Sequence, residues 1–274
     1  MDETLKYEKK VLQLKEDIVK MIYLAGSGHV GGSLSVLDIL VALYYNVLKI
    51  DPKNPNMEDR DRMVLSKGHA CPALYAVLAD KGYFPKEDLS TLRKLGSHLQ
   101  GHPDSRSTPG IDCNGGSLGQ GASVAGGMAM AAKYLGKDYR VFAIIGDGES
   151  QEGLIWEVAM SAVQFKLDNF TLILDHNGLQ IDGSNEEIMG VGNMCDKFAA
   201  FGWDVTRLED GHDIAAITAA LEKKVTCKPK FICCETIKGH GISFMENNFM
   251  WHGKTIDEAT YKAAMKELEE AVNG

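Results

Sequence analysis

The sequence contains no run of eighteen consecutive apolar residues, and its opening segment, MDETLKYEKK, is charged from the start. A membrane-spanning helix needs about 20 predominantly apolar residues, and a secretory signal places an apolar stretch behind a short basic segment. We therefore expect neither a transmembrane helix nor a signal peptide. The expected location is the cytoplasm.

The chain also lacks an excess of positive charge. It carries 29 Lys and Arg residues against 38 Asp and Glu residues, which gives a formal net charge of -9 at pH 7. Non-specific binding to nucleic acids or to anionic membrane surfaces depends on clusters of Lys and Arg. We therefore expect no nucleic acid and no membrane among the partners of this protein.

The cysteines lack the spacing that typically holds zinc or a redox-active disulfide. None of the six belongs to a C-x-x-C motif, and the adjacent pair in FICC lies inside an apolar run. Such cysteines are typical of reduced, mostly buried thiols in a cytoplasmic protein. The six residues are Cys71, Cys113, Cys195, Cys227, Cys233 and Cys234.

No internal repeat, low-complexity tract or long linker divides the 274 residues. Short apolar runs rich in β-branched residues alternate with segments of helical periodicity, which predicts an α/β fold: a mainly parallel sheet with helices on both faces. We expect strands starting at Arg62 and over 141–145, 170–174, 203–206 and 230–236. We expect helices around 11–22, 34–48, 118–135, 151–165, 193–200 and 212–226 and from Asp257, with an irregular segment over 96–116.

The strand over 141–145 ends in a carboxylate between two glycines, Gly146-Asp147-Gly148. Ligands of parallel α/β sheets bind outside the carboxyl ends of the strands, where the next helix begins. Glycine lets the backbone turn sharply there and lets a ligand approach closely. A simpler interpretation stays open on this motif alone, in which Asp147 only caps the following helix.

A second polar side chain, Asn177, follows the next strand, and twenty-eight residues separate Gly148 from Asn177. This is the span of one strand–helix–strand crossover. If the two strands are neighbours, Asp147 and Asn177 lie side by side at one edge of the sheet. A carboxylate, an amide oxygen, a backbone carbonyl and phosphate oxygens would form a Mg²⁺ site, and neighbouring helix N-termini would suit a diphosphate.

These two motifs resemble the signature of thiamine-diphosphate enzymes, in which Mg²⁺ (or another divalent cation such as Ca²⁺ or Mn²⁺) holds the diphosphate of the cofactor. Further segments are similar to the transketolase family and follow its order. They are SGHVGGSLS, RMVLSKGHACPALYA, QGHPD, GGSLGQG, NGLQIDG and KGHGISFMENNFMWHGK. The similarity runs from about residue 10 to residue 255, and the last segment most resembles the N-terminal subunit of split, two-chain transketolases.

The resemblance implies a role for each matching residue. The metal ligands would be the side chains of Asp147 and Asn177 and the carbonyl of Leu179. The cofactor would contact His69, Gly116, Ser117, Leu118, Gly148, Asn177 and His252. The residues expected to take part in catalysis are His29, His102 and His252, which would line the substrate channel, and Glu152.

The resemblance also implies a division of the enzyme between two chains. Residues 1–274 would form a single diphosphate-binding domain, whereas the pyrimidine-binding domain and the C-terminal domain would lie on a second, C-terminal subunit. We expect an α₂β₂ assembly of the two. Glu152 would communicate with the glutamate of the second subunit that activates the cofactor, and two such carboxyls close together would share a proton and titrate as a pair.

The activity implied by the resemblance is transfer of a two-carbon ketol unit from a ketose phosphate to an aldose phosphate. The sugars are left open, because split transketolases serve the pentose phosphate route or specialised sugar catabolism. Two alternatives also stay open. One is another thiamine-diphosphate component, similar to 1-deoxyxylulose-phosphate synthase or to the α component of a 2-oxoacid decarboxylase. The other is a non-catalytic cofactor-binding module.

Two positions depart from the family pattern. Val30 follows His29 where the family usually has proline, and His176 precedes Asn177 where an acid is common. Neither change removes an expected ligand. The four histidines that match no implied role, which are His98, His176, His212 and His240, are interpreted as structural.

Overall fold

The computed structural model describes residues 3–273, with the side chains from residue 7 to residue 271. The described residues form a five-stranded sheet in the order β1-β2-β3-β5-β4, in which every neighbouring pair is parallel. The strands are β1 (Arg62–Leu65), β2 (Val141–Gly146), β3 (Phe170–His176), β4 (Asp204–Leu208) and β5 (Lys230–Glu235). The α/β fold predicted from the sequence is therefore confirmed.

Strands β2 and β3 lie side by side, and their pairing aligns Gly146 with Asp175. All of β2 is buried, as expected for a parallel strand that is covered on both faces. Successive side chains point to opposite faces, so Phe142 and Ile144 join one hydrophobic cluster while Ala143 and Ile145 join the other. The aligned ends of the two strands place the residues that follow them at one edge of the sheet.

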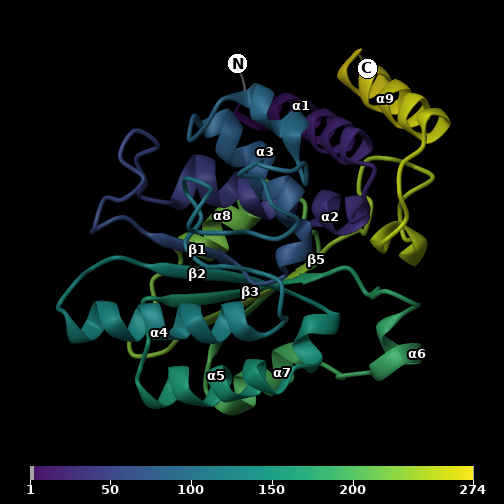
Figure 1. The fold of residues 1–274 in the computed structure, drawn as a ribbon. Helices are drawn as coiled ribbons and strands as arrows, with labels where there is room; N and C mark the ends of the chain where they lie inside the picture. The colour runs from purple at the N-terminus through teal and green to yellow at the C-terminus, as the bar shows by residue number, and fades with distance from the viewer. Residues whose placement is uncertain (1–2, 274) are drawn as a thin grey trace.

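Helices cover both faces of the sheet (Figure 1). One face carries α1 (Glu3–Ala25), α2 (Val30–Ala42), α3 (Cys71–Lys81) and α8 (Ile214–Glu222), with α9 (Glu258–Asn273) packed on α1. The other face carries α4 (Gln120–Tyr134), α5 (Gly153–Gln164) and α7 (Met194–Phe201), and the short α6 (Asn185–Met189) lies near the carboxyl ends of the strands. The helices predicted from the sequence correspond to α1, α2, α4, α5, α7, α8 and α9, whereas no helix is predicted at α6.

Helix α2 begins an unusually apolar stretch of the chain. Residues 30–47 are long and apolar enough to cross a membrane by length and mean hydropathy alone. However, 89% of this window is buried inside the protein, and every residue of α2 is buried. A helix that is apolar on all sides is buried in a core or spans a membrane, and the packing observed here is that of a core helix.

Glycines allow helix α4 to approach its neighbours closely. A Cβ atom at Gly126 would lie 2.7 Å from Val158 Cγ2 on α5, and one at Gly121 would lie 2.7 Å from Ser66 Oγ, next to β1. Contacts that short do not occur between packed atoms. The small residues of α4 therefore set its distance from the sheet and from α5.

Candidate active site

Polar residues from four strand ends converge on one cavity. Lys67 follows β1, Asp147 follows β2, Asn177 follows β3 and Lys238 follows β5, and all four line a cavity of about 380 Å³. Ten of the residues expected to form the site line it as well: His29, His69, Gly116, Leu118, Asp147, Gly148, Glu152, Asn177, Leu179 and His252. The other two, His102 and Ser117, lie outside the lining and are exposed.

The Asp147 carboxylate is fixed by hydrogen bonds from the end of β3. Its Oδ2 atom accepts from the backbone N–H groups of Asn177 and Gly178, each at 2.9 Å. Its Oδ1 atom accepts from His176 Nδ1, and this bond raises the pKa of His176 above its ordinary value. Asp147 and Asn177 therefore lie side by side, and His176, which we read as structural, holds the carboxylate in place.

The oxygens expected to bind a metal keep free acceptor capacity. An ionised carboxylate has about four lone-pair positions, and three donors reach Asp147. The Asn177 amide is oriented on both sides, because Oδ1 accepts from Leu179 N at 3.2 Å and Nδ2 donates to Ser35 Oγ at 3.3 Å. A carboxylate, an amide oxygen and the Leu179 carbonyl form a hard-oxygen set that suits Mg²⁺ or Ca²⁺.

The Leu179 carbonyl already faces a positive charge. Lys238 Nζ donates to this carbonyl at 3.3 Å and lies 3.4 Å from His252 Nδ1. The Lys238 side chain is only 2% exposed, and burial, followed by the charge of Lys67, lowers its pKa to about 8. The Leu179 carbonyl thus already accepts a hydrogen bond from a buried lysine, and a carbonyl oxygen has a second lone pair for another partner.

Lys67 forms a buried ion pair with Asp175 beneath the cavity, and the two side chains are 2% and 0% exposed. Asp175 also accepts from Ser35 Oγ at 2.7 Å and from Thr236 Oγ1, and Lys67 donates to the Gly32 carbonyl at 3.2 Å. Burial alone would raise the pKa of Asp175, but the charge of Lys67 and these donors outweigh it and hold the pKa low.

Three histidines form a cluster that lines the cavity. The ring centroids of His29, His69 and His252 lie 4.9–5.6 Å apart. Burial, followed by neighbouring cations, lowers the pKa of His29 to about 4 and that of His252 to about 3. Burial and the charge of Lys67 hold the pKa of His69 well below its ordinary value. All three rings are therefore neutral at pH 7.

The remaining expected residues lie at the rim. His102 is exposed and packs against Gly116, where a Cβ atom would be 3.6 Å from His102 Cγ. Gly116 has a φ of 128°, which a side chain disfavours. Glu152 is exposed where α5 begins, so its carboxylate is available to a second chain.

Sequence reasoning missed Glu149 and both lysines. Glu149 is 2% exposed, and it accepts from Ser66 Oγ, from Gly119 N at 2.8 Å and from Gly146 N at 3.2 Å. Burial raises its pKa. Lys67 and Lys238 both follow a strand and precede a glycine, which is the same sequence signal that marks Asp147.

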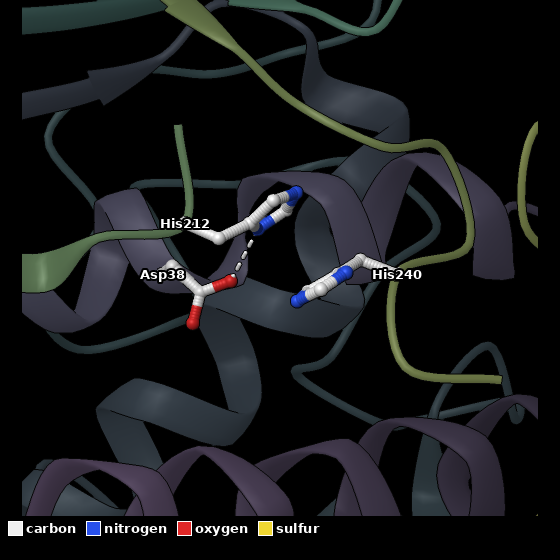
Figure 2. Close-up of side chains that lie close together, drawn as sticks. All are labelled: Asp38, His212 and His240. Carbon is white, nitrogen blue, oxygen red and sulfur yellow. Dashed lines mark hydrogen bonds and ion pairs between the residues drawn. The ribbon is translucent and has the colours of Figure 1, made fainter. Parts of the chain in front are cut away.

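A second group of polar residues lies apart from this cavity (Figure 2). His212 Nδ1 donates to Asp38 Oδ2 at 2.7 Å, and the ring of His240 stacks on that of His212 with centroids 3.6 Å apart. Ligand atoms of the three lie within metal-binding reach of one another. However, His212 Nε2 accepts from Ile237 N at 2.9 Å, which fixes the proton on Nδ1 and leaves that atom no lone pair for a metal. This hydrogen bonding favours the structural interpretation of His212 and His240, which stays a prediction, and a larger cavity of about 1070 Å³ lies beside them.

The fold and the cavity define a diphosphate-binding α/β domain. The family described as "Transketolase, thiamine diphosphate binding domain" matches residues 8–270. The chain belongs to the transketolase family and contains its thiamine diphosphate-binding domain.

Two relatives are subunits of similar length. The chain is 50% identical over 246 residues to the 6-deoxy-6-sulfo-D-fructose transketolase subunit SqwG of Clostridium sp. (strain MSTE9), covering 89% of each chain. It is 42% identical over 260 residues to an apulose-4-phosphate transketolase subunit of Phocaeicola vulgatus, covering 94% of this chain and 92% of the relative. The identification with the N-terminal subunit of a split transketolase is confirmed.

Solved structures agree with this assignment. The transketolase of Campylobacter jejuni superimposes with a TM-score of 0.89 at 35% identity, over 98% of this chain and 43% of that one. The transketolase of Leishmania mexicana gives a TM-score of 0.86 at 27% identity, over 97% of this chain and 45% of that one. The chain thus spans less than half the length of the solved transketolases that it matches.

Proposed function

We propose that this chain binds thiamine diphosphate and, together with a second subunit, transfers a two-carbon ketol unit from a ketose phosphate to an aldose phosphate. The observation that carries the proposal is the single cavity in which Asp147, Asn177 and the Leu179 carbonyl lie beside two buried lysines. Neutral histidines border the same cavity. A metal-held diphosphate and a polyhydroxylated substrate need these two environments next to each other.

Different residues of the cavity would hold the metal ion and the diphosphate of the cofactor. Asp147, Asn177 and the Leu179 carbonyl would hold Mg²⁺, or Ca²⁺ or Mn²⁺ in its place, which in turn would hold the diphosphate. Lys67 and Lys238 would supply further positive charge, and Gly148 leaves room for a close approach because it has no side chain. When bound, thiamine diphosphate supplies the carbanion chemistry that breaks and forms the carbon–carbon bond.

The histidines would handle protons and hydroxyl groups. A neutral imidazole offers one N–H donor and one acceptor nitrogen, so His29, His69 and His252 can each orient a sugar hydroxyl and exchange a proton with it. A charged ring could only donate. The low pKa values of His29 and His252 therefore keep both functions available at neutral pH.

A second subunit would complete the site. Subunits of similar length are named as parts of transketolases, and we propose that the partner carries the pyrimidine-binding domain, in an α₂β₂ assembly. Exposed apolar side chains at Ile181, Ile188 and Met189 lie near the cavity and would be covered by that partner. A cytoplasmic location is also proposed, and the six free cysteines support it.

The class of sugar substrate is proposed from the names of the two relatives. The two relatives are named for different sugars, one carrying a sulfonate and the other a phosphate. We propose that the donor is a ketose with an anionic group at its far end, because both names share that feature. Both kinds of ketose therefore belong in the assay.

The test is ketol transfer by the purified chain with thiamine diphosphate and Mg²⁺, compared with the same chain isolated with its native partner. Activity is expected only when both subunits are present and only with a ketose donor. Activity of the chain alone would refute the two-chain proposal. Decarboxylation of pyruvate by the assembled complex, without ketol transfer, would instead favour a 2-oxoacid decarboxylase component.

A further inference from the structure

Arg93 lies beside the histidine cluster in a conformation that is unusual for its residue type. It follows a 3₁₀ turn over Lys86–Thr91 and has a φ of 60°. The left-handed region is disfavoured for side chains other than glycine and asparagine. The backbone is held there because Arg93 N donates to Leu99 O at 2.9 Å. Unfavourable backbone geometry that persists in a folded protein is concentrated at functional sites.

The guanidinium of Arg93 lies between the backbone at Gly101 and the ring of His29. Its Nη2 atom donates to Gly101 O at 3.2 Å, and a Cβ atom at Gly101 would be 2.9 Å from Nε and 3.1 Å from Cζ. A side chain at residue 101, directly before His102, would therefore displace the guanidinium from this position. On its other side, Nη2 lies 3.5 Å from His29 Nδ1.

We propose that Arg93 is a positioning residue that holds His29 as the neutral tautomer with its proton on Nε2. A guanidinium stays charged and can only donate hydrogen bonds, so the ring nitrogen facing it must present a lone pair. The proton of the neutral ring then lies on Nε2. The importance of this tautomer for catalysis rests on the proposed function, whereas the tautomer itself does not.

The surroundings of His29 favour the uncharged ring. After burial, the charge of Arg93 is the largest influence that lowers its pKa, followed by His102 and Lys238. His69 and His252, which pack against the ring, are neutral as well. The Gly28 backbone acts in the opposite direction through a hydrogen bond. If Nδ1 carried the proton and donated it to the Gly28 backbone, the ring would be the opposite tautomer. The contact with Gly28 and the contact with Arg93 therefore favour different tautomers.

His252 is placed in a similar way. Its Nδ1 atom faces Lys238 Nζ at 3.4 Å, and an ammonium group has donors but no acceptor. His29 and His252, whose rings lie edge to face with their centroids 5.6 Å apart, would therefore both keep their N–H on Nε2. The two rings can then donate hydrogen bonds to two oxygens of the same sugar substrate. Two such bonds fix the orientation of the sugar in the site.

The test uses the isolated chain labelled with ¹⁵N-histidine, in which NMR shifts of the ring nitrogens report the tautomer and pH titration reports the pKa. Wild-type protein is expected to show the Nε2–H form of His29 at pH 7. Arg93→Met should mix the tautomers and raise the pKa of His29, because the positive charge beside the ring is removed. Lys94→Met, which removes a neighbouring exposed charge, should change neither.

Two further variants keep the test informative if Arg93→Met folds poorly. Arg93→Gly suits the left-handed backbone and should match wild type in thermal melting while losing the tautomer preference, and Arg93→Lys should retain part of it. An Nδ1–H form in wild-type protein, or wild-type shifts in both Arg93→Met and Arg93→Gly, would overturn the proposal. Because the measurement needs neither substrate nor partner, it can succeed even if ketol transfer is disproved.

Discussion

The buried ion pair between Lys67 and Asp175 allows us to predict how much one substitution lowers the free energy of unfolding. Replacing Lys67 with Met removes the cation and leaves the fully buried Asp175 with Ser35 and Thr236 as its remaining side-chain donors. Breaking a buried pair by removing one partner typically costs about 3–5 kcal/mol. A protein of this kind is stable by about 5–15 kcal/mol, so the loss should be readily measured by urea denaturation at pH 7.

The loss in free energy of unfolding caused by Lys67→Met should depend on pH, and its direction follows from the pKa of Asp175. In the wild-type protein the pKa of Asp175 is lowered, so its contribution is present above the unfolded value near 3.9 and is lost only as the pH falls through the lower folded pKa. In Lys67→Met the carboxyl loses its cation and its pKa rises. The loss in free energy of unfolding should therefore become smaller as the pH falls from 7 to 5, because Asp175 of the variant takes up a proton and becomes neutral.

Two variants serve as controls. Lys262→Met removes an exposed helical pair with Glu258, in which the side chains are 71% and 68% exposed, and such pairs contribute about 0.3–0.5 kcal/mol. The double variant Lys67→Met/Asp175→Asn should recover part of the lost stability, because it no longer buries an unpaired charge. A loss in Lys67→Met no larger than in Lys262→Met, or one that does not change with pH, would refute this reasoning.

Three other predictions concern binding, packing and assembly. Asp147→Ala should abolish Mg²⁺-dependent binding of thiamine diphosphate by the assembled enzyme in calorimetry, and unchanged binding would contradict the site. Gly121→Ala should lower stability by about 1–3 kcal/mol through overpacking against Ser66. Gly127→Ala in the same helix, where nothing lies within 4 Å of the new Cβ, should raise stability by about 0.5–1 kcal/mol; equal effects would argue against the packing account. Ile188→Asp should leave the melting temperature of the isolated chain unchanged but prevent co-purification of the second subunit, and a normal yield of complex would exclude this surface.

The sequence was sufficient to predict the sheet and one corner of the site. The apolar runs of β2 and β3 are long and rich in branched residues, and both end in glycine turns, so the position of Asp147 beside Asn177 followed once the strands were taken as neighbours. The carboxyl ends of parallel strands meet at one edge of the sheet whatever the packing of the side chains.

Other contacts could not be predicted because they join segments that are distant in the chain and irregular in structure. Lys67 and Asp175 are 108 residues apart, and nothing in the pattern around either residue indicates a partner. Arg93 reaches His29 across 64 residues from a loop whose backbone conformation the sequence does not encode in any periodic way. Pairing of this kind depends on how loops pack, which hydrophobic periodicity does not describe.

Glu149 shows what the arrangement of these loops means for binding. The buried Glu149 carboxylate accepts hydrogen bonds from the segments after β1, before α4 and at the end of β2. Three segments near the cavity are therefore held in place by one side chain. The conformational entropy of ordering these loops is therefore lost when the chain folds, before any ligand arrives. Ligand binding then loses less entropy, and affinity increases without any additional contact to the ligand.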